Sequence, residues 1–136
     1  MECGAAVAQV TVNHLVTGSN PVSPANLGVD MKYIIDIDDT ICKTVNKDYH
    51  NSVPIRERIN NLNLLFDRGH EIHYWTARGS GSGIDWSELT LKQLDEWGCK
   101  YTTASCGKPS YDVWVDDKAI NDLNFFRELD LDLMFE

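Results

Sequence analysis

The sequence lacks the features that mark membrane proteins and nucleic-acid-binding proteins. No run of apolar residues approaches the roughly 20 residues that a helix needs to cross a bilayer. Basic residues are few, since 12 Lys and Arg stand against 21 Asp and Glu and leave a formal net charge of −9. A nucleic-acid-binding protein would need a basic face to neutralise phosphates. We therefore expect neither a membrane nor a nucleic acid as a partner.

Cysteine pairs with metal-binding spacing are also missing, and so is a secretory signal. The four cysteines are Cys3, Cys42, Cys99 and Cys106. None of them forms a CxxC pair, and the histidines do not complete a zinc-finger spacing. The first residues show no basic segment followed by a hydrophobic core. These absences indicate free thiols in a reducing compartment, and we expect a cytoplasmic protein.

The 136 residues are enough for one compact domain, and their composition divides them into two unequal parts. Residues 1–30 contain no Lys or Arg and are interrupted by Gly18, Pro21, Pro24 and Gly28. A dense pattern of apolar residues begins only at Met31. We expect residues 1–30 to be an N-terminal extension that is non-native or loosely ordered. Residues 31–136 are the predicted domain.

The pattern after Met31 alternates between strands and helices. The expected strands are 33–37, 71–76, 101–105 and 112–115, with a last edge strand at 131–135. The expected helices run from Pro54 to Gly69, from an Asp85 cap to Gly98, and over 119–128. The stretches 41–53 and 79–83 are predicted as an irregular excursion and a flexible loop. Alternation of this kind predicts an α/β fold in which a parallel sheet carries helices on both faces.

Polar residues gather where the expected strands end. The first strand runs into Asp36-Ile37-Asp38-Asp39-Thr40, and the second into Thr76-Ala77-Arg78. Lys108 follows the third, and Asp116-Asp117 the fourth. A parallel sheet brings such residues to one edge, where α/β proteins bind their ligands. Several carboxylates at one place repel each other unless a cation compensates, and oxygen ligands without Cys or His favour Mg²⁺.

These residues, in this order, resemble the four motifs of the haloacid-dehalogenase superfamily, and the resemblance covers essentially all of residues 31–136. It implies a Rossmann-like fold and a magnesium-dependent phosphatase. Asp36 matches the nucleophile, and Asp38 the acid/base that separates phosphatases from dehalogenases. Thr76 and Lys108 match the phosphate-binding hydroxyl and the charge-balancing lysine. The implied Mg²⁺ ligands are Asp36, Asp38 through its backbone carbonyl, and the pair Asp116 and Asp117. Asp39 departs from the family pattern, because many members have Gly there.

The gaps between motifs are each largely filled by one helix and one strand, which indicates a member without a cap domain. The run Tyr74-Trp75-Thr76-Ala77-Arg78-Gly79, together with Asp85-Trp86 and the segments 107–109 and 115–120, resembles small bacterial phosphatase-like proteins of capsule and lipopolysaccharide synthesis. This resemblance suggests a small phosphorylated sugar as substrate. Ala77 and Arg78 follow Thr76 and are candidates for phosphate binding. Arg78 is equally explained as a surface arginine that pairs with a local acid. A homo-oligomer would help to close the exposed site.

Three other functions compete with the phosphatase. The first is a non-catalytic phosphate-binding or regulatory module on the same fold, which intact Asp36 and Asp38 disfavour. The second is a sugar phosphomutase, which the short gaps disfavour, since such enzymes usually need a cap to retain the intermediate. The third is a response-regulator receiver domain, which lacks Asp-x-Asp-x-Thr after its first strand.

Overall fold

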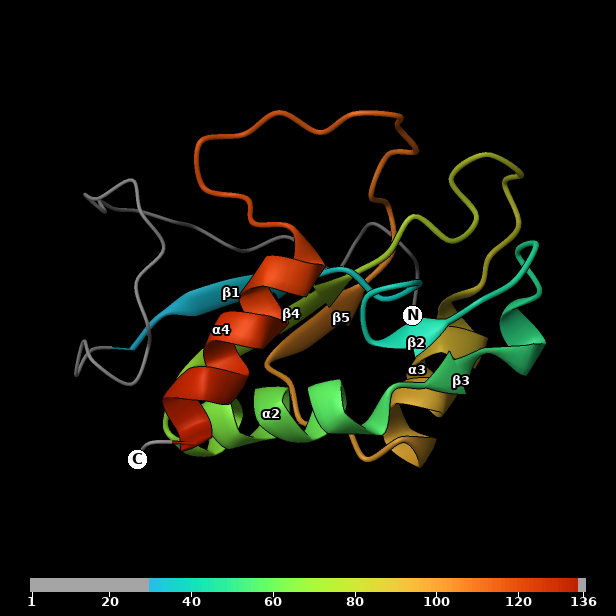
Figure 1. The fold of residues 1–136 in the computed structure, drawn as a ribbon. Helices are drawn as coiled ribbons and strands as arrows, with labels where there is room; N and C mark the ends of the chain where they lie inside the picture. The colour runs from blue at the N-terminus through green and yellow to red at the C-terminus, as the bar shows by residue number, and fades with distance from the viewer. Residues whose placement is uncertain (1–29, 135–136) are drawn as a thin grey trace.

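The computed structural model describes residues 30–134 (Figure 1). In chain order the elements are β1 (Lys32–Ile35), β2 (Cys42–Lys43), η1 (Tyr49–Asn51), β3 (Val53–Pro54), α2 (Arg56–Asp67), β4 (Glu71–Trp75), α3 (Ser87–Glu96), β5 (Thr103–Ser105) and α4 (Asp122–Met134). The predicted extension at residues 1–30 falls outside this part of the chain except for its last residue. None of the described helices is long and apolar enough to cross a membrane.

The central sheet has three parallel strands in the order β1-β4-β5. Ile35 pairs with Tyr74, and Trp75 pairs with Ser105, so all three strands end at the same edge. The residues that follow these strands are therefore neighbours in space. This confirms the predicted α/β class with a parallel sheet, and it confirms that the Asp36 and Thr76 segments meet.

All three described α-helices pack against one face of this sheet, whereas helices were expected on both. The chain winds from β1 through α2 to β4 and then through α3 to β5, always in one direction. Right-handed crossovers in one direction place their helices on the same face. On the opposite face, Ile34 in β1 is 60% exposed.

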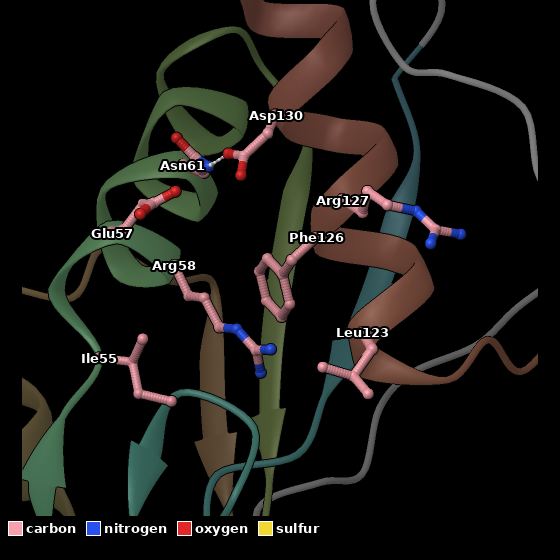
Figure 2. Close-up of a pocket in the computed structure, with 8 residues that line it drawn as sticks. All are labelled: Ile55, Glu57, Arg58, Asn61, Leu123, Phe126, Arg127 and Asp130. Carbon is pink, nitrogen blue, oxygen red and sulfur yellow. Dashed lines mark hydrogen bonds between the residues drawn. The ribbon is translucent and has the colours of Figure 1, made fainter.

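Helices α2 and α4 lie side by side over the sheet, as Figure 2 shows. The guanidinium of Arg58 lies 4.6 Å from the centre of the Phe126 ring, and its Nη1 donates to Asp122 at 2.8 Å. Asn61 also donates to Asp130 across the two helices. A cavity of about 220 Å³ remains between them.

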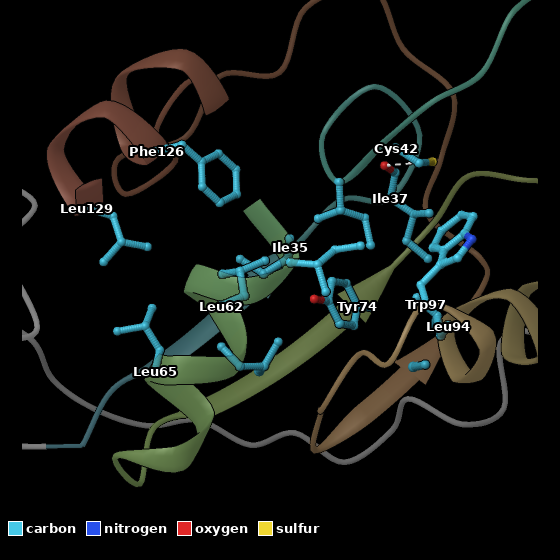
Figure 3. Close-up of a cluster of buried hydrophobic side chains, with 14 residues drawn as sticks. Ile35, Ile37, Cys42, Leu62, Leu65, Tyr74, Leu94, Trp97, Phe126 and Leu129 are labelled. Carbon is cyan, nitrogen blue, oxygen red and sulfur yellow. Dashed lines mark hydrogen bonds between the residues drawn. The ribbon is translucent and has the colours of Figure 1, made fainter. Parts of the chain in front are cut away.

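The core lies between the helices and the sheet (Figure 3). Strand residues on the helix-facing side, such as Ile35, Tyr74 and Ala104, meet Leu94 of α3 and Phe126 of α4 there. A fully buried side chain of this size contributes about 1.5–3 kcal/mol through removal of apolar surface from water. This packing fixes the strand ends that carry the polar residues.

Several predicted elements differ in the structure. Residues 112–115 form no strand and lie in an exposed segment, 107–121, that precedes α4. Residues 131–134 continue α4 because Phe126, Leu129 and Leu133 share one helical face against the core. Helix α4 begins at Asp122 rather than near residue 119. Helix α3 begins at Ser87, and its cap position is Trp86 rather than the predicted Asp85. Asp85 instead accepts a 2.9 Å bond from the backbone N of Ser87.

The 41–53 stretch is more regular than expected. Strands β2 and β3 form a short antiparallel pair in which Cys42 faces Pro54, and η1 lies between them. Two-residue strands are too short to show an alternating pattern in sequence. This hairpin and α2 fill the described stretch between Thr40 and β4, in keeping with the absence of a cap domain there.

Candidate functional site

Asp36 stands directly after β1 at the common edge of the strands. Its Oδ1 lies 3.2 Å from Nζ of Lys108, and its Oδ2 accepts a 3.1 Å bond from the hydroxyl of Thr40. Burial raises the pKa of Asp36 above 3.8, while the charge and hydrogen bond of Lys108 and the bond from Thr40 lower it. The side chain remains 33% exposed. A carboxylate that is desolvated, oriented and still accessible can act as a nucleophile.

A tight turn holds Asp36 and its neighbours in place. The backbone N atoms of Thr40 and Ile41 both donate to the carbonyl of Ile37, at 3.1 and 3.0 Å. Asp39 has φ of 63°, in the left-handed region that favours Gly and tolerates Asp. Arg58 Nη1 also donates to the Thr40 carbonyl at 2.9 Å.

Asp38 is held by an arginine from the next strand's loop. Arg78 reaches Oδ1 through Nη2 at 2.8 Å and Oδ2 through Nε at 3.0 Å. The Thr44 hydroxyl donates to Oδ1 at 2.7 Å. The Asp38 side chain is 23% exposed, whereas that of Arg78 is 0% exposed. The alternative of a surface arginine with a local partner does not fit this placement, because the arginine is buried and its partner acid comes from a distant segment. Phosphate binding by Arg78 stays a prediction.

Thr76 and Ala77 follow β4 at the same edge. Thr76 is 1% exposed, and its hydroxyl oxygen accepts a 3.1 Å bond from the backbone N of Arg78. The hydroxyl hydrogen is not used in that bond and can point to an anion. The backbone carbonyl of Thr76 accepts a 3.1 Å bond from the backbone N of Lys108, and this bond connects the lysine segment to the end of β4. Ala77 is half-buried, and its carbonyl accepts from Ser80 N at 2.9 Å.

Asp116 and Asp117 do not join the other acids. Both lie on the exposed 107–121 segment. Asp116 Oδ1 accepts a 2.8 Å bond from the backbone N of Lys118. That bond is the largest of the interactions that lower the pKa of Asp116. Within residues 30–134 no group of three or more His, Cys, Asp or Glu side chains is close enough to hold a metal ion.

Aromatic side chains surround Lys108, and sequence reasoning missed them. The ammonium lies 5.0 Å from the Tyr111 ring centre and 5.7 Å from that of Trp114. It also donates to the Tyr111 hydroxyl at 3.3 Å. Their position within six residues of Lys108 was the available signal. A hollow of about 290 Å³ lies nearby, lined by parts of 78–85 and by residues 106–107.

Comparison with known proteins adds the fold alone. No protein-family model matches the chain, and no curated protein matches it. The crystal structure of a target protein from Vibrio cholerae is similar, with a TM-score of 0.63 and 24% identity, over 76% of this chain and 97% of that chain. That protein carries no functional name. The likeness shows a mixed α/β fold consistent with the Rossmann-like type, so function has to be argued from the site.

Proposed function

We propose that this chain is a phosphatase of the haloacid-dehalogenase type that hydrolyses phosphomonoesters through Asp36. The observation that carries the proposal is the arrangement around Asp36. A partly buried carboxylate at a strand end is paired with Lys108, is bonded by Thr40 and lies at the same edge as Thr76. A nucleophile, a cation and a hydroxyl at one edge are the groups that phosphoryl transfer requires.

The reaction has two steps. A carboxylate oxygen of Asp36 attacks phosphorus, the bond from phosphorus to the leaving oxygen breaks, and that oxygen takes a proton from Asp38. Water then attacks the aspartyl-phosphate, its proton passes to Asp38, and the acyl-phosphate bond breaks to release phosphate and restore Asp36. Lys108 and Thr76 stabilise the phosphoryl oxygens in both steps.

Mg²⁺ is part of the proposal, and the strand edge supplies part of its predicted ligand set. A magnesium ion in such a site is usually held by one or two carboxylates, by water and by the substrate phosphate. The Asp36 carboxylate and the backbone carbonyl of Asp38 would hold the ion at the strand edge, while Arg78 bonds only the carboxylate oxygens of Asp38. Asp116 and Asp117 would have to approach from the exposed 107–121 segment. When bound, the ion would neutralise charge on the phosphoryl oxygens.

The substrate class follows from the resemblance and from the openness of the site. The hollow beside Arg78 and Gly107 offers about 290 Å³ for the alcohol part of a small ester. We propose a small phosphorylated sugar of surface-polysaccharide synthesis, processed in the cytoplasm without a cap domain. Water would be excluded by the substrate itself or by a neighbouring subunit.

Phosphate release tests the function. The purified chain is assayed with a panel of phosphorylated sugars and nucleotides, with Mg²⁺ and with a chelator. Asp36→Asn should lower kcat by several orders of magnitude, because it removes the nucleophile. Near-normal turnover by Asp36→Asn would exclude the proposed mechanism.

A non-catalytic phosphate-binding module is the second candidate, and it is favoured by the finding that no cluster of three or more His, Cys, Asp or Glu side chains forms within residues 30–134. A binding module keeps the Lys108 and Thr76 contacts but needs no metal cluster. Isothermal titration with inorganic phosphate separates the two. Phosphate binding that requires Lys108, together with no turnover of any ester, would support the module.

A further inference from the structure

We propose that Arg78 is a positioning residue that holds Asp38 in the orientation from which it protonates the leaving oxygen. The inference rests on the proposed phosphatase function and assigns Arg78 a role other than phosphate binding. It follows from the burial of the two side chains, the bonds that the guanidinium makes, and the segments to which those bonds connect.

The guanidinium has no donor left for a substrate. Nε and Nη2 bond Asp38, and Nη2 also lies 3.4 Å from the Ser52 hydroxyl. Nη1 donates to the Thr90 hydroxyl at 3.1 Å and to Gln93 Oε1 at 2.7 Å. These contacts account for all five N–H groups of an arginine. A phosphate could bind Arg78 only by displacing Asp38 or an anchor from α3.

Arg78 is also fixed from several sides. Two of its acceptors belong to α3, and the Tyr49 ring covers the guanidinium with its centre 4.7 Å from Cζ. Gln93 Nε2 in turn donates to the Tyr49 carbonyl at 2.6 Å, so α3 and η1 are tied together around the arginine. A planar guanidinium with fixed anchors orients a carboxylate in two directions at once, which a lysine cannot do.

Asp38 can still exchange a proton with a substrate although Arg78 bonds its carboxylate. Its Oδ1 accepts from Nη2, from Nε at 3.2 Å and from Thr44, whereas Oδ2 accepts from Nε. Oδ2 therefore keeps room for a proton or for a leaving-group oxygen. The exposed fractions agree with this division, because Asp38 is 23% exposed and Arg78 is enclosed. Arg78 bonds the carboxylate from its buried side, and the exposed side of the carboxylate stays accessible to the substrate.

The kinetic test compares two esters that share a phosphate and a ring. Phenyl phosphate releases a basic phenolate that needs the proton from Asp38, whereas 4-nitrophenyl phosphate releases a stable anion. The quantity compared is kcat/KM, which covers the steps up to phosphoryl transfer to Asp36. Arg78→Lys should lower kcat/KM about 100-fold for phenyl phosphate and less than about tenfold for 4-nitrophenyl phosphate. If Arg78 were instead a direct phosphate ligand, Arg78→Lys would lower kcat/KM equally for both esters. An equal loss would therefore overturn the proposal.

Three variants control the comparison. Asp38→Asn should reproduce the same preference for 4-nitrophenyl phosphate, and adding Arg78→Lys to it should not increase that preference further. Thr90→Val removes one anchor without touching Asp38, so it should show a weaker preference in the same direction even if Arg78→Lys folds poorly. Arg56→Lys alters an arginine that bonds the Trp97 carbonyl and should affect both esters alike.

A measurement independent of turnover separates this inference from the proposed function. The Arg78 Nε–H signal, identified by its loss in Arg78→Lys, should exchange slowly with water in the wild-type chain and faster in Asp38→Asn. Fast exchange in the wild type would overturn the inference even for an active phosphatase. Slow exchange in a chain that hydrolyses neither ester would instead refute the phosphatase function, and the positioning role of Arg78 in the reaction with it.

Discussion

Lys108 and Asp36 form an ion pair of 3.2 Å across the end of the central strand. Asp36 follows β1 and Lys108 comes after β5, which are the two outer strands of the sheet. Between them, Thr76 follows β4 and accepts the backbone N–H of Lys108. The pair therefore spans the position where a phosphate would meet the nucleophile, the cation and the hydroxyl together.

The Asp36→Asn variant should be more stable than the wild type at neutral pH. The pKa of Asp36 is raised in the folded chain, mainly by burial, so the folded state disfavours the ionised carboxylate relative to the unfolded chain. Because the carboxyl pKa is raised on folding, the free energy of unfolding falls as pH rises from 3.8 to the pKa of Asp36 in the folded chain. At higher pH this loss of stability remains. Removing the charge removes this loss. Thermal unfolding measures the difference.

The same variant supplies its own control at low pH. Below pH 3.8 the unfolded chain is protonated as well, so the two chains should approach equal stability. Thr40→Val removes the hydroxyl that bonds Asp36 and should lower stability at neutral pH instead. An Asp36→Asn chain that unfolds at a lower temperature at neutral pH would contradict the prediction.

Replacing Lys108 by Met should impair turnover and change its pH dependence. Loss of one group that stabilises the phosphoryl oxygens costs about 100- to 1000-fold in kcat. Lys108 also lowers the pKa of Asp36, so without it that pKa rises further. The nucleophile must be ionised, and the acidic limb of the kcat/KM profile should therefore move to higher pH. Lys108→Arg keeps the charge and should leave the limb nearly in place, whereas an unmoved limb in Lys108→Met would argue against the pairing.

Gly79 and Gly81 should respond differently to alanine. A Cβ at Gly79 would lie 2.2 Å from the Ile84 carbonyl oxygen, and the residue has φ of 86°. A Cβ at Gly81 would meet nothing within 4 Å. We expect Gly79→Ala to lower the free energy of unfolding by about 1–3 kcal/mol and Gly81→Ala to change it little. Chemical denaturation measures both, and equal effects would contradict the turn geometry.

The parts of the site that sequence predicted are those fixed by local pattern. An apolar run followed by Asp36, and another followed by Thr76, locate two strand ends, and parallel pairing brings those ends together. The Arg78–Asp38 pair could not be read in the same way. It depends on how α3 and η1 pack around the guanidinium, and no spacing in the chain encodes that packing.

The wrong predictions of secondary structure have a similar physical origin. Residues 112–115 alternate like a strand, but a strand also needs a partner edge, and in the described part of the chain β1 pairs with β4 alone. Residues 131–134 contain closely spaced leucines that suit either a strand or a helix. The helical spacing of Leu129 and Leu133 from Phe126 decides for the helix once the core is formed.

A chain that starts at Met31 should fold and keep its activity. The backbone N of Met31 donates to His70 Nδ1 at 3.0 Å, and its carbonyl accepts from Glu71 N at 2.9 Å. Both bonds survive truncation, because a terminal ammonium also donates. We expect the free energy of unfolding to change by less than about 1 kcal/mol. A loss of several kcal/mol would show that residues 1–30 contribute to the folded domain.

The last prediction is that the chain forms a homo-oligomer that helps to close the site. Exposed apolar side chains gather on the 107–121 segment, where Val113 is 76% and Val115 is 90% exposed. Apolar side chains concentrated on one surface segment favour association. The 41–53 excursion and the loop at 79–83 could also close the site, and each has an exposed apolar residue in or beside it, Val53 at 61% and Ile84 at 56%.

Sedimentation at assay concentration compares the three segments. We expect Val115→Lys to dissociate the oligomer and to raise KM, since a charge in an apolar contact is costly and an open site admits water. Val53→Lys and Ile84→Lys are matched controls with the same type of substitution. Dissociation caused by Val53→Lys would show that the subunits meet at the 41–53 excursion, and dissociation caused by Ile84→Lys would show that they meet at the 79–83 loop. A wild-type chain that is strictly monomeric, and whose kcat/KM is unchanged when Gly81 and Gly83 are both replaced by Ala, would rule out closure by a neighbouring subunit and by the loop.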